Sequence, residues 1–151
     1  MKRSRCAPAA LWLGMLLCGV GCQRQSQNAP QRAPVEIGRI SLASIEPKPG
    51  TLLAPGSQMK VVAVVDYDLT AEGNGTVSLV IQDEKMRSLI PGAGPSVSIH
   101  HGHSTAELRY DLVIPQGSQR VVIYLPLLSA AVQVGDDTRA VATQEYAVKE
   151  Q

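Results

Sequence analysis

All three histidines of the 151-residue chain lie within four positions, as His100-His101-Gly102-His103. Imidazole nitrogens are common ligands for Zn, Cu and Ni. In an extended backbone successive side chains alternate between faces, so His101 and His103 would point the same way and His100 would point away. The spacing therefore predicts two ligands for one metal ion, although a closed zinc site takes four and the sequence identifies no carboxylate partner. The alternative interpretation is a polar, solvated loop between strands.

Acidic side chains gather at two further places. Asp66 and Asp68 would share the outward face of one strand, with Glu72 near its end. Asp136 and Asp137 fall in a late loop. Oxygen ligands from loops at one end of a β-domain can bind Ca²⁺. This spacing matches no calcium motif, so the favoured interpretation is solvated surface charge.

The sequence contains no arrangement typical of catalysis. A Ser-His-Asp triad would have to take its base from the histidine cluster, and no Gly-x-Ser-x-Gly elbow is present. Neither Gly-x-Gly-x-x-Gly nor a Walker pattern is available to cradle phosphates. We therefore predict a protein that is not an enzyme and carries no cofactor.

The N-terminal segment has the features of an export signal. A basic opening is followed by residues 6–20, a charge-free stretch rich in Ala and Leu. This order is typical of a secretory signal peptide, and the apolar run is too short to span a bilayer of about 30 Å. Because Cys6 and Cys18 lie inside the leader, Cys22 would be the only cysteine of the mature chain. The mature chain would then have neither a disulfide nor a cysteine-based metal site.

The segment Gly19-Val20-Gly21-Cys22 resembles the lipobox of bacterial lipoproteins. In that family a cysteine after a small residue receives a diacylglyceryl group on its sulfur, and the leader is then removed. Gly21 and Val20 fit the pattern, whereas Gly19 stands where leucine is usual. The resemblance implies that residues 1–21 are a lipoprotein signal peptide and that Cys22 is the lipid-attachment residue. Acyl chains contribute about 0.8 kcal/mol per buried CH₂, so the lipid would hold the protein on a membrane.

The residues after the predicted lipidation site have the composition of a tether. Residues 22–35 contain almost no apolar surface to offset the entropy of ordering, and their prolines favour extended conformations. We expect this tether to join the lipid to a folded domain over residues 36–151. In the lipoprotein family the residue after the lipidated cysteine influences sorting. Gln23, which is not aspartate, implies the outer membrane, with the protein facing the periplasm.

Charge and aromatic content exclude several classes of partner. Without the leader the chain has 11 basic and 13 acidic residues, a net charge of −2, with no long block of one sign. Nucleic-acid binding and polybasic membrane binding both need clustered basic residues. Phe is absent and Trp12 belongs to the leader. Sugar-binding faces and single-strand binders, which stack rings on aromatic side chains, are therefore disfavoured.

From Val35 onward, short alternating segments separated by Gly and Pro predict an all-β domain. The alternation is cleanest over residues 59–69, which predicts a strand with one buried face. Asn74-Gly75 predicts a hairpin turn into a return strand over residues 77–81.

The rest of the domain supplies the remaining strands. Residues 121–125 are apolar on both faces, as expected of a central strand, and Pro126 is predicted to end it. Residues 86–99 have the weakest alternation and predict an edge of the sheet. This edge and Leu127-Leu128 are candidates for partner contact, with burial in the core as the alternative. Further strands are expected over residues 40–44, 86–90, 97–99, 106–114 and 139–148.

About seven strands in about 115 residues match the immunoglobulin-like or fibronectin type III sandwich in size and rhythm. The Cys…Trp…Cys hallmark is missing, so the resemblance is architectural, and a small β-barrel is the alternative. We expect a lipid-anchored cell-envelope protein that acts as a non-catalytic interaction or structural module on an unidentified envelope partner. The alternative function is a periplasmic metal-binding or sensing domain that uses the His100–His103 segment.

Overall fold

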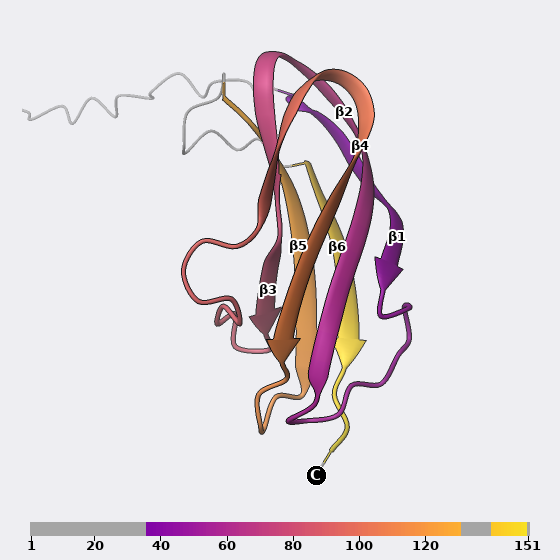
Figure 1. Ribbon diagram of the computed structural model, residues 1–151, viewed down its shortest axis with the longest axis vertical. Coiled ribbons are helices and arrows are strands. Elements are labelled where there is room, and N and C mark those ends of the chain that lie inside the picture. The colour runs from indigo at the N-terminus through magenta and orange to yellow at the C-terminus, as the bar shows by residue number, and fades with distance from the viewer. Residues whose placement is uncertain (1–35, 131–139, 151) are drawn as a thin grey trace, which may run out of the picture. The chain divides into compact units, whose positions relative to one another are not determined.

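The computed structural model describes residues 36–130 and 140–150 (Figure 1). Over these ranges the chain contains strands and no helix, so no helix there is long and apolar enough to cross a membrane. The strands are β1 (Gly38–Glu46), β2 (Gln58–Ser78), β3 (Val80–Asp83), β4 (Ser96–Val113), β5 (Arg120–Ser129) and β6 (Ala140–Ala147).

The two longest strands, β2 and β4, form an antiparallel ribbon that serves two layers. Residues 58–69 of β2 pair with the end of β4 on one side, and residues 62–69 also pair with β1 on the other. Residues 74–78 of β2 pair with the start of β4, and residues 75–77 also pair with the end of β5. β3 then continues along β5, whose other side pairs with β6. Figure 1 shows β4, β2 and β1 side by side in front of β5 and β6.

The result is a sandwich of seven strand segments. One layer is the three-stranded sheet β1–β2–β4, and the other contains the start of β4, the end of β2 with β3, then β5 and β6. All ladders between these strands are antiparallel, as in an immunoglobulin-like domain. The predicted fold class is therefore confirmed. β1 and β6 share no ladder, so the sheet is open and the alternative of a closed barrel does not apply.

The ribbon passes from one layer to the other at an irregularity in its register. Leu69 pairs with Gly102 and Asn74 pairs with His100, so residues 70–73 lie opposite a single residue of β4. Gly73 and Gly102 have φ angles of 92° and 105°, a backbone region that suits glycine. Extra residues on one strand bend a ladder without ending it. The hairpin turn predicted at Asn74-Gly75 is therefore wrong, because β2 continues to Ser78 and both residues remain paired.

The core lies on the inner faces of the two layers. The alternation predicted over residues 59–69 is confirmed, since each alternate residue is at most 7% exposed. These residues are Met59, Val61, Ala63, Val65, Tyr67 and Leu69. β5 is the central strand of its layer and is apolar on both faces, as predicted.

Pro126 does not end β5, contrary to the prediction, because β5 continues to Ser129. The proline faces the gap between β2 and β3, where the ladder with β5 is interrupted. In that gap Leu79 donates its N–H to the carbonyl oxygen of Pro95 at 2.9 Å. A residue without an N–H fits where no ladder bond is needed.

The segment between β1 and β2 is held against the end of β6. The Tyr146 hydroxyl donates to the Pro47 carbonyl oxygen at 2.5 Å, and burial raises the pKa of Tyr146 to about 12. Leu53 donates its N–H to the Ala147 carbonyl and accepts from the Lys149 N–H. These contacts join the two sheets on the side where β1 and β6 approach each other.

The adjacent residues Leu127 and Leu128 provide a matched test of this packing. Leu127 is fully buried, whereas Leu128 is 47% exposed. Leu127→Lys would place an ammonium group in the core without a partner, so we expect this variant to be unfolded at 25 °C. Leu128→Lys should change the free energy of unfolding by about 0.5 kcal/mol or less. Circular dichroism with urea titration distinguishes the two, and equal stability of both variants would contradict the burial of Leu127.

Candidate functional site

The three histidines lie within β4, where the ribbon passes between the layers, and not in a loop between strands. His100 is opposite Asn74, and its Nδ1 is 2.8 Å from the Asn74 side-chain oxygen. His101 Nδ1 is 3.3 Å from the Ala71 carbonyl oxygen. All three imidazoles are exposed, so the solvation predicted for this segment is present although the loop is not. The irregular part of β2 and the residue that follows it thus supply hydrogen-bond partners for His101 and His100.

His103 lies on the other side of the irregularity, directly opposite Asp68 of β2. Asp68 in turn is opposite Arg39 of β1, which completes a row of three polar residues across the sheet. Asp66 occupies the next outward position on β2, as the alternation predicts, and it is half-buried. Because Tyr67 points into the core between them, both carboxylates belong to the outer face of the three-stranded sheet.

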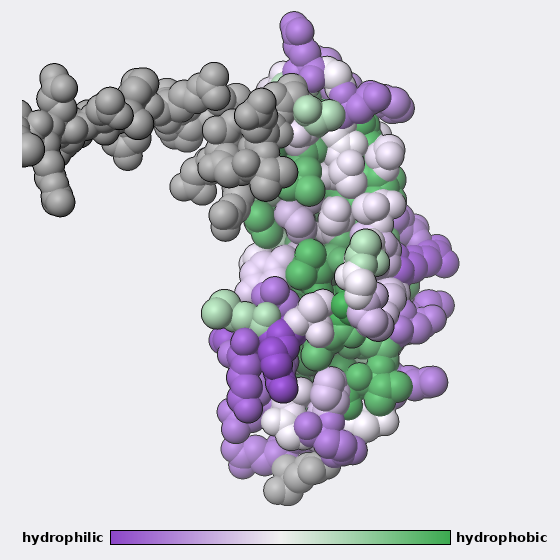
Figure 2. Space-filling model, turned by 90° about the vertical axis from the view of Figure 1, so that its left-hand side faces the viewer, coloured by the Kyte–Doolittle hydropathy of each residue, from purple (hydrophilic) through white to green (hydrophobic). Residues whose placement is uncertain are grey.

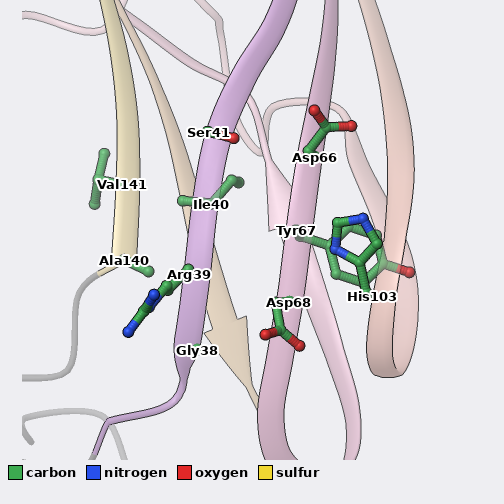
Figure 3. Close-up of a pocket in the computed structure, with 10 residues that line it drawn as sticks. All are labelled: Gly38, Arg39, Ile40, Ser41, Asp66, Tyr67, Asp68, His103, Ala140 and Val141. Carbon is green, nitrogen blue, oxygen red and sulfur yellow. The ribbon is translucent and has the colours of Figure 1, made fainter.

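An open depression of about 580 Å³ lies beside these residues (Figure 3). Its lining comes from β1, β2, β4 and the start of β6: Gly38, Arg39, Ile40, Ser41, Asp66, Tyr67, Asp68, His103, Ala140 and Val141. Figure 3 shows the Arg39 side chain directed away from the Asp68 carboxylate. Arg39 instead lies 3.9 Å from Glu36, and both of these side chains are exposed.

The chemistry of this face suits contact with another surface. Across the described parts of the chain, neither Asp66 nor Asp68 has a cationic partner within ion-pair distance. Nor do those parts contain a group of three or more His, Cys, Asp or Glu side chains that could hold a metal ion. Small-molecule sites are usually concave and mostly apolar, with a few convergent polar groups. This depression has a largely apolar lining of that kind, but it is open, and the charged side chains of Arg39 and Asp68 at its margin are exposed.

A second ordered feature is the turn that follows β3. The Asp83 side chain, which is buried, accepts hydrogen bonds from the backbone N–H groups of Lys85 and Arg87, each at 2.9 Å. It also accepts from Arg87 Nε at 2.7 Å and forms an ion pair with that guanidinium. Met86 has a φ of 59° at this turn. The strand predicted over residues 86–90 is therefore wrong: the Asp83 carboxylate holds the start of this segment in a turn, and only a single bridge, between Ser88 and Gln82, forms beyond it.

The protonation of Asp83 is coupled to folding. Burial by itself would raise the pKa of Asp83, but the hydrogen bonds from Arg87 and Lys85 and the Arg87 charge outweigh it. The pKa in the folded state is thus below the ordinary aspartate value of about 3.9. A lowered pKa contributes stability that is present above the unfolded value and is lost as the pH falls through the folded value.

We expect Asp83→Asn to lower the stability at pH 7, because the neutral amide loses the ion pair with Arg87. The difference from the parent should shrink below about pH 4, where the carboxylate becomes protonated first in the unfolded chain and then, at lower pH, in the folded parent. Urea unfolding midpoints between pH 7 and pH 2.5 measure this. Glu145→Gln is the control, since its pair with Arg120 is half-exposed and should contribute little. A difference between Asp83→Asn and parent that stays constant over this range would contradict the coupling.

The long free edge of β4 is a feature that the sequence analysis did not identify. Among the described strands, β4 pairs with β2 and with no other. The predicted edge over residues 86–99 includes only the first four residues of β4. In that segment Ile90 is buried and Leu89 packs against the core. The signal for the edge was available in the alternating charges of Glu107, Arg109 and Asp111, since charged side chains commonly protect free edges.

Several predicted features lie outside the described residues. These are the signal peptide, the lipid-attachment residue Cys22, the tether over residues 22–35, and Asp136 and Asp137.

Comparison with known proteins does not assign this chain to a family. No protein-family model matches the sequence, and no curated protein matches it. One similar solved structure is the CARDB domain of the PF1109 protein from Pyrococcus furiosus, in complex with di-metal ions. It is 12% identical with a TM-score of 0.46, and the match covers 77% of this chain and 97% of that one. The structural-genomics target SoR45 is 11% identical with a TM-score of 0.38, over 77% and 90% of the two chains. Likenesses at this level do not bear on function.

Proposed function

We propose that this protein is an exported lipoprotein whose immunoglobulin-like domain serves as a non-catalytic interaction or structural module in the cell envelope. The observation that carries the proposal is the sequence Gly21-Cys22 at the end of a signal-like leader. A proline-containing polar segment follows, and it separates that cysteine from the folded domain. In the lipoprotein family this order places a domain at a distance from the lipid surface, and Gln23 directs it to the outer membrane.

The surface features of the domain support a role in binding a macromolecule more than a role in catalysis. Its open depression has Asp66, Asp68 and His103 at the margin, on an exposed sheet face. The free edge of β4 offers backbone hydrogen-bonding groups to a partner. Both features suit recognition of a macromolecule, for which neither an enclosed pocket nor a reactive group is required.

The lipid anchor is tested with Cys22→Ser. We expect the parent protein to fractionate with membranes and to remain there after a high-salt wash, because acyl chains are insensitive to ionic strength. Cys22→Ser should appear in the soluble fraction, whereas Cys18→Ser, which changes only the leader, should behave as the parent. Separation of inner from outer membranes then tests the location. A Cys22→Ser protein that stays membrane-bound would overturn the anchor.

Metal binding is the second candidate function, because exposed His103 faces Asp68 across the ladder and His101 is two residues away. Under our proposal, Zn²⁺, Cu²⁺ and Ni²⁺ should show no saturable binding in calorimetric titration of the mature chain carrying Cys22→Ser. The matched variant combines His101→Ala and His103→Ala. Micromolar binding that this variant abolishes would favour the metal-binding function over the interaction module.

A further inference from the structure

The free edge of β4 extends along the whole three-stranded sheet. Residues 102–113 pair with β2 through one edge, and no described residue pairs with their other edge. In Figure 1 this edge faces left, because β4 is the leftmost strand of the front layer. An edge of this length presents a row of backbone N–H and C=O groups that can pair with a further strand.

The surface beside this edge is partly apolar. Figure 2, in which the left-hand side of Figure 1 faces the viewer, shows a band of apolar surface with polar side chains along both margins. Tyr110 of β4 is only half-buried, although it packs against the core. A strand added to β4 would cover part of this band and the remaining exposed surface of Tyr110.

The charges on β4 are arranged symmetrically about one residue. Glu107 and Arg109 are exposed on the outward face, flank Leu108 and form an ion pair within the strand. If a second copy of β4 pairs antiparallel about a two-fold axis through Leu108, each Glu107 lies opposite Arg109 of the other copy. Directly opposite pairs of opposite charge stabilise an antiparallel ladder, and like charges destabilise it. A two-fold axis satisfies both pairs at once, since the same surface is used twice.

The other positions fit the same register. Leu108 is the midpoint of residues 103–113, so this register uses the free edge along its length. On the inner face, small Ala106 would lie opposite Tyr110 of the other copy. Registers centred on the residue before or after Leu108 would set Glu107 against Glu107, or Arg109 against Arg109. A register centred on Tyr110 would pair Arg109 with Asp111 but would use only half of the edge.

We propose that two copies of this chain associate through β4, antiparallel and about a two-fold axis at Leu108. The two three-stranded sheets then form one continuous sheet of six strands, in the order β1-β2-β4-β4-β2-β1. This inference goes beyond the proposed function and does not depend on lipidation at Cys22, because it rests on the edge and the charges of the folded domain.

The test is the oligomeric state of the mature chain carrying Cys22→Ser, measured by sedimentation velocity over a range of concentrations. We expect a monomer–dimer equilibrium. Glu107→Arg makes all four facing side chains positive and Arg109→Glu makes all four negative, so each should raise the dimer Kd by at least about tenfold. The double variant Glu107→Arg/Arg109→Glu restores opposite charges and should recover the parent Kd to within about threefold.

Mixing the two single variants provides the sharpest outcome. A Glu107→Arg chain is positive at both positions and an Arg109→Glu chain is negative at both, so an equimolar mixture should dimerise although neither does so well alone. Circular dichroism and urea unfolding confirm that each variant is folded. Asp111→Arg should leave the dimer intact, since Asp111 faces Thr105 in this register.

The proposal is overturned if the parent chain is monomeric at its highest soluble concentration. It is equally overturned if the single variants dimerise as well as the parent, or if the double variant does not recover. Dimers that are lost with Asp111→Arg and kept with Glu107→Arg would replace this register by the one centred on Tyr110.

Discussion

The register of the β2–β4 ribbon is the constraint on which both layers depend. Because side chains alternate along a strand, a slip of one residue would exchange the two faces of the sheet. Asp66 and Asp68 would then point into the core, and Val65 and Tyr67 would face water. The burial of one complete face of β2 therefore fixes the pairing with β4 and with β1 at the same time. The polar row of Arg39, Asp68 and His103 and the outward charges of β4 both follow from it.

The sequence predicts local alternation well, and the structure shows where partners override local signals. The strand over residues 59–69 was predictable because its apolar residues recur at every second position, and these are the residues that the core buries. Asn74-Gly75 has the chemistry of a turn, but the same chemistry is compatible with a bent, continuous strand when a second strand bends alongside it. Pro126 stays within β5 because it lies where the ladder along β5 is interrupted between β2 and β3, so no N–H is needed there. Neither outcome can be read from the residues themselves.

The candidate site shows the same division between local and long-range information. Alternation alone places the carboxylates of Asp66 and Asp68 outward, whereas the position of Asp68 between Arg39 and His103 in the sheet requires the register of three strands. The Asp83 turn was missed because the segment after it contains apolar residues that resemble a strand. What decides its conformation is a buried carboxylate that binds two N–H groups and a guanidinium. These partners lie only two and four residues further along the chain, so the arrangement is local, but the pattern of apolar residues carries no signal for it.

In many sandwiches the two sheets are separate sets of strands, held together by side chains and linked through loops. Here β2 and β4 contribute backbone hydrogen bonds to both layers, and they do so at a common bend. The layers are consequently joined by continuous main chain as well as by the core, so one layer cannot slide or detach while the other keeps its ladder. The domain should behave as one cooperative unit, with amide protons in both layers protected to a similar degree. If the domain is held at a surface through its N-terminal segment, as we propose, a pull transmitted through β1 would be shared by both sheets at once.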